Sequence, residues 1–153
     1  MPIVIRKKAK FTIGADPEMF VVNNDGAFVS SVGLFGGTKA KPKPLKLGVH
    51  VQEDNVAVEF NIRPAVTANA FKKSVSSAIQ QIQDMAGKHG LKLSIVASAI
   101  FPEQELQSKQ AKVFGCDPDY NVWSLRENPR PRAVNPFLRS AGGHIHIGAG
   151  EDC

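Results

Sequence analysis

The sequence predicts an α+β domain in which a mostly antiparallel sheet is backed by helices on one side. Several short segments alternate apolar and polar residues, as strands with one buried face do. Strong turn residues join two of these segments as a hairpin, and one long amphipathic helix lies in mid-chain. Because strand and helix segments lack the regular alternation of a doubly wound sheet, an antiparallel arrangement is favoured.

The first strands lie in the N-terminal part of the chain. Residues 11–22 alternate loosely and predict a strand despite Pro17. The Asn-Asn-Asp-Gly turn at 23–26 then returns the chain into a second strand at 27–31. Residues 33–48 are rich in Gly, Pro and Lys, which predicts a long loop, and such loops are more often functional than idle.

The middle of the chain holds the clearest element. Residues 49–51 and 56–62 predict strands, and residues 68–89 predict a helix that Thr67 caps and Gly90 ends. Its apolar residues follow three- and four-residue spacing and form one stripe that must cover a sheet. The stripe consists of Phe71, Val75, Ala78, Ile79, Ile82 and Met85.

The C-terminal part is less periodic. Residues 91–100 predict a buried strand, residues 102–110 a short helical turn, and the proline-rich residues 115–139 mostly loop. Residues 144–147 predict a last strand, in which the two histidines share one face and the two isoleucines pack on the other. The histidine face suits a metal or a phosphate, although a surface strand with two solvated histidines remains an alternative.

Length and composition indicate a single domain spanning residues 1–153. No apolar run approaches the roughly 20 residues needed to span a bilayer, and the N-terminus does not have the pattern of a secretory signal. The two cysteines, Cys116 and Cys153, predict no disulfide framework. We therefore expect a cytoplasmic protein with no membrane partner.

The chain carries a formal net charge of +5, and its basic residues cluster at 6–10, 39–46 and 126–139. Such clusters attract polyanions, but no nucleic-acid-binding signature accompanies them, so nucleic acid is not the expected partner. A solvated basic surface is the simplest interpretation, and nucleotide phosphates are the best functional alternative.

Two strand segments carry acids in a suggestive pattern. Asp16 and Glu18 point to one side of an extended chain, where two like charges call for a cation such as magnesium between them. The alternative is an Asp-Pro turn at a strand edge. Glu59 shares its face with Ala57 and with two asparagines, Asn55 and Asn61, opposite an apolar face. This face either meets water or, together with the first segment, lines a cation and phosphate site.

Two loops carry weaker signals. The Gly-Gly-Thr-Lys segment at 36–39 lacks the Walker order, yet its backbone amides and Lys39 suit an anion. The segment 114–123 repeats the Asp-Pro-acid arrangement with Asp117 and Asp119. Cys116 has no neighbouring His or Lys, which argues against a nucleophilic thiol.

Five motifs follow one another between residues 11 and 150. They are Gly-Ala-Asp-Pro-Glu at 14–18, Gly-Thr-Lys at 37–39, Glu-Asp-Asn-Val-Ala-Val-Glu-Phe-Asn at 53–61, Gly-Cys-Asp-Pro-Asp at 115–119 and Gly-Gly-His-Ile-His-Ile-Gly at 142–148. In this order they resemble the motifs of the phage carboxylate–amine ligase family, which is related to glutamine synthetase and glutamate–cysteine ligase. The resemblance implies a partial glutamine-synthetase-like sheet with a polar active-site face.

The resemblance also implies a reaction. A carboxylate would attack the γ-phosphate of ATP to give an acyl phosphate, which an amine would displace to form an amide or peptide bond. Mg²⁺ or Mn²⁺ would neutralise the phosphates. The implied partners are small-molecule or peptide carboxylates and amines, and the compartment is the host cytoplasm if the protein is phage-encoded.

Seven side chains receive roles from this resemblance. The implied metal ligands are Asp16, Glu18, Glu59 and His144. The implied catalytic residues are Glu59, His144 and His146, and the residues implied to contact ATP are Lys39 and Asn61. Relatives continue past the histidine strand, so we expect the N-terminal portion of a longer ligase domain, with a second copy or a partner completing the site.

Two alternatives stand beside the ligase. The spacing of His144, His146 and Glu151 resembles the first metal motif of cupins. A catalytically inactive structural module that binds a polyanion through the basic loops is the other alternative.

Overall fold

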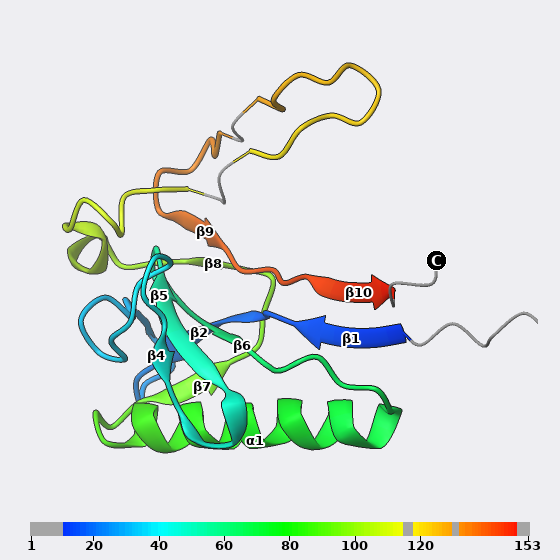
Figure 1. The fold of residues 1–153 in the computed structure, drawn as a ribbon. Helices are drawn as coiled ribbons and strands as arrows, with labels where there is room; N and C mark the ends of the chain where they lie inside the picture. Colours follow the sequence, from blue (N-terminus) through cyan, green and yellow to red (C-terminus); the bar gives the residue numbers. More distant parts are fainter. Residues whose placement is uncertain (1–10, 115–117, 130–131, 150–153) are drawn as a thin grey trace, which may run out of the picture.

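The computed structural model describes residues 11–114, 118–129 and 132–149. The predictions for Cys116, Asp117, Glu151 and Cys153, and for the basic cluster at 6–10, lie outside these residues. The predicted α+β class is confirmed, with mostly antiparallel sheets and one helix (Figure 1). Within the described residues, a single α-helix covers the main sheet, and two short 3₁₀ turns complete the helical structure.

The main sheet has the strand order β3-β2-β6-β5-β4. A sixth strand, β7, also pairs with β2 but lies outside this linear order. The bounds of its strands are β2 Glu18–Val22, β3 Phe28–Val29, β4 Lys43–Pro44, β5 His50–Asp54, β6 Ala57–Asn61 and β7 Lys92–Ser94. Two smaller sheets pair β1 (Phe11–Ala15) with β10 (Ile145–Ala149) and β8 (Ser98–Ile100) with β9 (Leu138–Ser140). All of these pairings are antiparallel.

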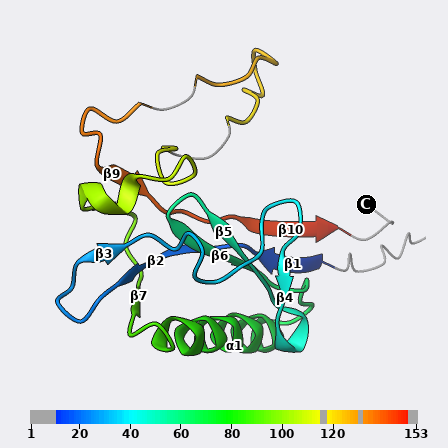
Figure 2. The same cartoon turned by 90° about the vertical axis from the view of Figure 1, so that its left-hand side faces the viewer.

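The helix α1 (Ala68–Gly87) lies along one face of the main sheet (Figure 2). The Thr67 side chain caps its first turn by accepting a hydrogen bond from the Ala70 amide at 3.2 Å, as predicted. The helix ends at Gly87, two residues before the predicted end, and Gly90 follows with φ of +71°. Its stripe packs on the sheet in one core cluster, whose buried members include Val21, Val51, Val58, Phe60, Ala78 and Ile82.

A second, smaller core lies on the other side of β2. Phe20 contacts Phe28 and Phe101 edge-on, with ring centroids 5.8 and 5.2 Å apart. The predicted helical turn is confirmed as a 3₁₀ turn, Glu103–Leu106, whose Leu106 is buried in this cluster. The two cores together fix β2 from both faces, and β2 begins with Glu18.

Two strand predictions are wrong. Residues 11–22 form two strands, because the chain leaves the β1–β10 sheet at Asp16 and Pro17 and enters the main sheet at Glu18. A proline has no amide hydrogen to continue a ladder, which favours this break. Residues 91–100 are likewise divided into β7 and β8, and Ile95 and Val96 between them are exposed rather than buried.

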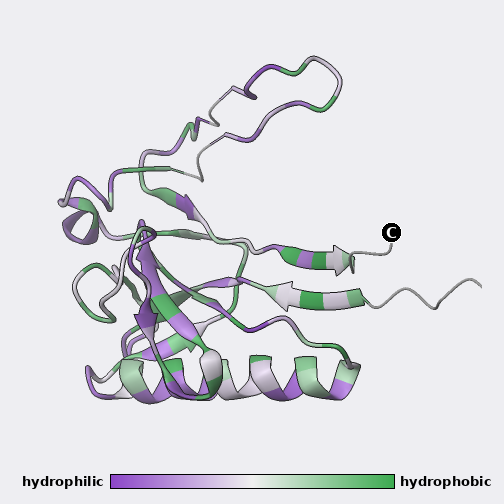
Figure 3. Ribbon diagram, in the orientation of Figure 1, coloured by the Kyte–Doolittle hydropathy of each residue, from purple (hydrophilic) through white to green (hydrophobic). Residues whose placement is uncertain are grey.

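The last strand, β10, forms where predicted, but its isoleucines do not pack. All five of its residues are exposed, and Ile145 and Ile147 retain 63% and 70% of their surface. Figure 3 shows the expected alternation of hydrophobic and hydrophilic residues along this strand. Among the described residues, β10 pairs only with β1, and no other layer covers its apolar face. The alternation of apolar and polar residues in β10 therefore does not lead to burial.

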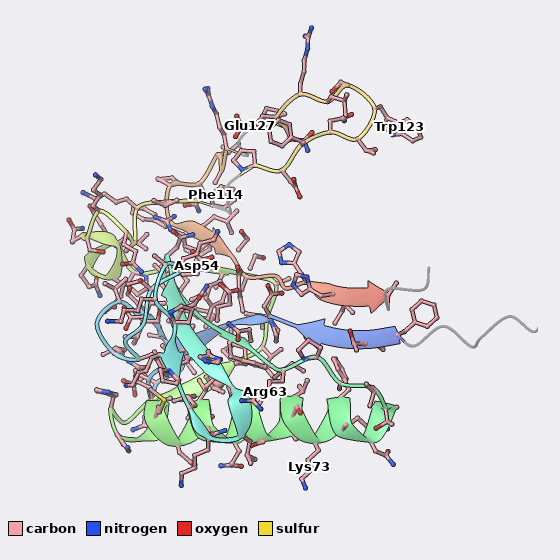
Figure 4. All side chains as sticks on the ribbon, viewed as in Figure 1. Asp54, Arg63, Lys73, Phe114, Trp123 and Glu127 are labelled. Atoms are coloured by element: carbon pink, nitrogen blue, oxygen red, sulfur yellow. The ribbon has the colours of Figure 1, made fainter. Side chains whose placement is uncertain are left out.

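Residues 118–129 form a hairpin-like arm that extends away from the body of the molecule (Figure 4). The arm closes through the Asn121 amide, which donates to the Arg126 carbonyl at 2.8 Å, and through a bridge between Tyr120 and Glu127. Trp123 lies at its far end and is 91% exposed. In the described parts of residues 115–139, the predicted loop is confirmed apart from the start of β9. No helix in the described part of the chain is both long and apolar enough to cross a membrane.

Candidate metal and phosphate site

Acids from three strands of the main sheet meet on one of its faces. Glu18 on β2 and Glu59 on β6 are direct cross-strand partners, so their side chains lie on the same face. Asp54 ends β5, and the β5–β6 register, which pairs Gln52 with Glu59 and Asp54 with Ala57, brings it to this face. Carboxylate oxygens of Glu18, Asp54 and Glu59 all lie within 4.8 Å of one another. Such closely spaced like charges favour a cation between them.

Glu59 lies in the middle of this acidic group and is partly buried. Burial raises the pKa of Glu59 above its ordinary value, and the negative charges of Asp54, Glu18 and Asp16 raise it further. A hydrogen bond from the Gln52 amide to Glu59 Oε2, at 2.7 Å, acts in the opposite direction. A half-buried carboxylate surrounded by other carboxylates is typical of a functional site.

His146 on β10 and His144, which directly precedes this strand, both contact Asp16. His146 Nε2 lies 3.1 Å from Asp16 Oδ2, and His144 Nδ1 lies 3.5 Å from Asp16 Oδ1. The two imidazoles therefore share a face, as predicted, and their side chains are 70% and 64% exposed for His144 and His146. Asp16 Oδ1 also accepts the His144 backbone amide at 3.0 Å, so this carboxylate holds both the strand and the rings.

The glycines before the histidines let the chain approach the acids closely. The Gly142 amide donates to Glu18 Oε2 at 2.8 Å, and the Glu18 amide donates to the Gly142 carbonyl at 2.9 Å. A Cβ on Gly143 would lie 2.8 Å from Pro17 Cα, a distance that no side chain tolerates. Gly143 therefore lets the chain that leads into β10 lie against the Asp-Pro-Glu segment, whereas a Cβ on Gly142 would meet nothing within 4 Å.

These groups line a cavity of about 400 Å³. Its walls are formed by Asp16, Glu18, Lys39, Asp54, Glu59, Pro118, Asp119, His144 and His146. Six of the seven residues with predicted roles are thus brought together. The seventh, Asn61, lies on β6 two positions after Glu59, where it pairs with His50. It is not among the residues that line the cavity.

Two acids of the cavity had no predicted ligand role. Asp54 follows Glu53 in the sequence, and only the hairpin register reveals that it neighbours Glu59. Asn55, with φ of +55°, makes the tight turn that sets this register. Asp119 lies at the base of the arm, and the repeated Asp-Pro-acid pattern was the one sequence signal that pointed to it.

The donor set suits hard divalent cations. Mg²⁺ prefers oxygen ligands and is commonly bound by one or two carboxylates together with substrate phosphates. Carboxylate oxygen also suits Mn²⁺, whereas imidazole nitrogen is more typical of Zn²⁺, Cu²⁺, Fe²⁺ and Ni²⁺ sites. The three carboxylates of Glu18, Asp54 and Glu59 could therefore hold a Mg²⁺ or Mn²⁺ ion.

Comparisons of the chain with protein-family models, curated proteins and solved structures find no match. The class that the fold and the cavity define is an α+β protein with an acid- and histidine-lined cavity at the junction of two sheets.

Proposed function

We propose that the protein is an ATP- and Mg²⁺-dependent carboxylate–amine ligase with a glutamine-synthetase-like site. The observation that carries this proposal is the convergence of Glu18, Asp54 and Glu59 within 4.8 Å, in a cavity that also holds Lys39. Closely spaced carboxylates beside a lysine are what a metal-bound polyphosphate requires, because the cation satisfies the acids and the lysine attracts the phosphates.

The metal would be held by Asp16, Glu18, Glu59 and His144, with Asp54 as an additional ligand. When bound, Mg²⁺ or Mn²⁺ neutralises charge on the transferred phosphoryl group. Lys39 provides a point charge for a phosphate oxygen. Asn61 is not among the residues that line the cavity. It would contact ATP only if part of the nucleotide extends out of the cavity along β6.

In the proposed reaction a substrate carboxylate oxygen bonds to the γ-phosphorus of ATP and ADP leaves. The amine nitrogen then bonds to the acyl carbon, the carbon–oxygen bond to phosphate breaks, and the nitrogen loses one proton. His146, whose Nε2 lies 3.1 Å from Asp16 Oδ2, would accept that proton, since imidazole is the commonest general base in enzymes.

The substrates would be small-molecule or peptide carboxylates and amines that reach the cavity from solvent. Because the His144 and His146 side chains are largely exposed, a second copy or a partner chain would complete this wall. Exclusion of water from the reacting groups would protect the activated carboxylate from hydrolysis.

The test is nucleotide turnover with a panel of carboxylates and amines. We expect ADP and phosphate release that requires Mg²⁺ or Mn²⁺ and both organic substrates, followed by ³¹P NMR and mass spectrometry of the amide product. Glu18→Gln is expected to lower the rate by about a hundredfold or more, because even the loss of a residue that only supports a metal ligand commonly costs about 10–100-fold. Glu103→Gln, an exposed acid on the 3₁₀ turn remote from the cavity, is the matched control.

Two results would contradict the proposal. One is the absence of ADP release across the panel with either metal. The other is tight transition-metal binding that His144→Ala removes and Glu18→Gln leaves unchanged, which would favour a cupin-like metal-binding protein. Salt-sensitive binding of a polyanion without nucleotide turnover would instead favour the structural module.

A further inference from the structure

Glu53 points away from the cavity and into the glycine-rich loop. Its strand neighbour Asp54 lines the cavity, and successive strand residues face opposite sides. The Glu53 carboxylate accepts three backbone hydrogen bonds from the loop. The donors are the amides of Gly33 at 2.8 Å, Phe35 at 2.9 Å and Gly36 at 2.7 Å. Such charge-assisted bonds to backbone amides are stronger than neutral ones.

The loop is fixed to β5 by further contacts. The Glu53 amide donates to the Gly37 carbonyl at 3.3 Å, and Lys43 Nζ donates to the Phe35 carbonyl at 3.0 Å. Gly37 has φ of +84°, and a Cβ there would lie 2.3 Å from the Val51 carbonyl oxygen, so only glycine fits. The backbone from 33 to 37 is therefore held directly against the strand that carries Asp54.

This anchored backbone leads directly into the turn that carries Lys39. The Thr38 amide donates to the Lys41 carbonyl at 3.0 Å, and the Lys41 amide donates back at 2.9 Å, which places Lys39 at the tip of the turn. Lys39 is the one lysine or arginine among the described residues that line the cavity. The hydrogen bond from the Gly36 amide to Glu53 thus lies three residues before Lys39 in the same anchored segment.

We propose that Glu53 is a positioning residue that holds Lys39 where it binds the phosphate chain of a nucleotide. The inference rests on the proposed function for the identity of the nucleotide. The role of Glu53 and Lys39 requires only that the ligand carries a polyphosphate. Five carboxylates of the cavity lining repel such an anion, so the bound cation and Lys39 supply the attraction. Displacing Lys39 weakens phosphate binding while leaving the metal ligands in place.

The experiment is a binding cycle with Mg²⁺-loaded protein, using Mg·ATP and inorganic triphosphate as probes in calorimetry. The variants are Glu53→Gln, Lys39→Ala and the double substitution. We expect Glu53→Gln and Lys39→Ala each to weaken binding of both probes by about tenfold, the loss expected for one charged contact, and the double variant to be no weaker than Lys39→Ala. Binding of Mg²⁺ alone should be unchanged.

Glu105→Gln is the matched control, because Glu105 Oε2 also accepts a loop amide, that of Ser30 at 2.8 Å, without leading to Lys39. Hydrogen exchange should be faster at Gly33, Phe35 and Gly36 in Glu53→Gln and unchanged there in Glu105→Gln. Additive losses in the double variant, unchanged probe affinity in Glu53→Gln, or unchanged exchange in this loop would each overturn the inference.

The two proposals fail separately. If Lys39 and Glu53 are coupled in triphosphate binding but no ligase product forms, the inference holds and the ligase proposal fails. If product forms while the two substitutions act additively, the ligase proposal holds and the role of Glu53 is overturned. If the wild-type protein binds neither probe in the presence of Mg²⁺, both are overturned.

Discussion

The main sheet and the β1–β10 pair supply the same cavity but are built in opposite ways. The main sheet is covered by α1 on one side, and its strands contribute fully buried residues such as Val51, Val58 and Phe60. All five residues of β10 are exposed, including both isoleucines. The carboxylates of the cavity thus come largely from a rigid framework, whereas the histidines come from a strand with little packing.

This difference shows what holds the histidine strand in place. β10 pairs with β1 over five residues, and the chain just before it is bound by the acids, since Asp16 accepts the His144 amide and Glu18 accepts the Gly142 amide. The same carboxylates are the proposed metal ligands. Metal binding and the docking of β10 are therefore coupled. Substitutions in the packed main sheet and substitutions at β10 should accordingly change stability and amide exchange in different ways.

The largest expected effect comes from the packed side. Phe60→Ala removes a fully buried ring and should lower the free energy of unfolding by about 3–5 kcal/mol, the usual cost of such a cavity. Ile147→Ala, on the exposed face of β10, should change it by no more than about 0.5 kcal/mol. Urea unfolding followed by circular dichroism measures both, and equal losses would mean that the apolar face of β10 is covered in solution.

Metal binding should stabilise both the main sheet and β10. At a Mg²⁺ concentration a hundred times its dissociation constant, the unfolding free energy should rise by about 2.7 kcal/mol. If His144 is a ligand, amide exchange in β10 should slow together with exchange in β5 and β6. Asp54→Asn should reduce both effects, and chelation with EDTA should reverse them in the wild-type protein. Slower exchange confined to the main sheet would exclude His144 from the ligand set.

A smaller effect is expected from releasing β10 at Asp16. Asp16→Ala removes the acceptor of the His144 amide and the partner of the His146 ring, which should cost about 1 kcal/mol. Exchange at the amides of β10 should become faster, while exchange in β5 and β6 remains unchanged. Asp16→Asn retains an oxygen acceptor and is the control for the hydrogen bond. A loss of protection throughout the sheet would show that β10 belongs to the same cooperative unit.

Local signals predicted the framework well. The Asn-Asn-Asp-Gly turn predicted the hairpin of β2 and β3, and the three- and four-residue spacing predicted α1 with its Thr67 cap. Alternation was less informative for β10, because it identifies the residues that share a face and not whether another layer covers that face. The exposed isoleucines illustrate this distinction.

The site was predictable where its residues are close in sequence. Asp16 with Glu18, and His144 with His146, form recognisable pairs two positions apart, and the structure places all four in one cavity. Asp54 was missed because its proximity to Glu59 depends on the register of a hairpin. The loop contacts of Glu53 connect residues 17 to 20 positions apart and leave no local pattern in the sequence.

The smallest expected effect is a pH dependence that arises from Glu59. Because its folded-state pKa is raised above 4.5, chiefly by burial, the ionised carboxylate destabilises the metal-free fold at neutral pH. This cost disappears as the pH falls through the raised pKa and is absent below 4.5, where the unfolded chain is protonated as well. Glu59→Gln, which keeps an acceptor for Gln52, should therefore stabilise the metal-free protein slightly at pH 7, with no gain below that range.

Urea titrations between pH 4 and 8 measure the Glu59 effect, with Glu103→Gln as the exposed control. In saturating Mg²⁺ the order should reverse, because the wild-type carboxylate then has a cation to bind and the glutamine does not. A Glu59→Gln variant that is less stable than the wild type without metal at pH 7 would mean that the ionised carboxylate is already compensated within the protein. The acids of the main sheet would then serve its architecture, and the case for a metal between the two regions would lose its electrostatic basis.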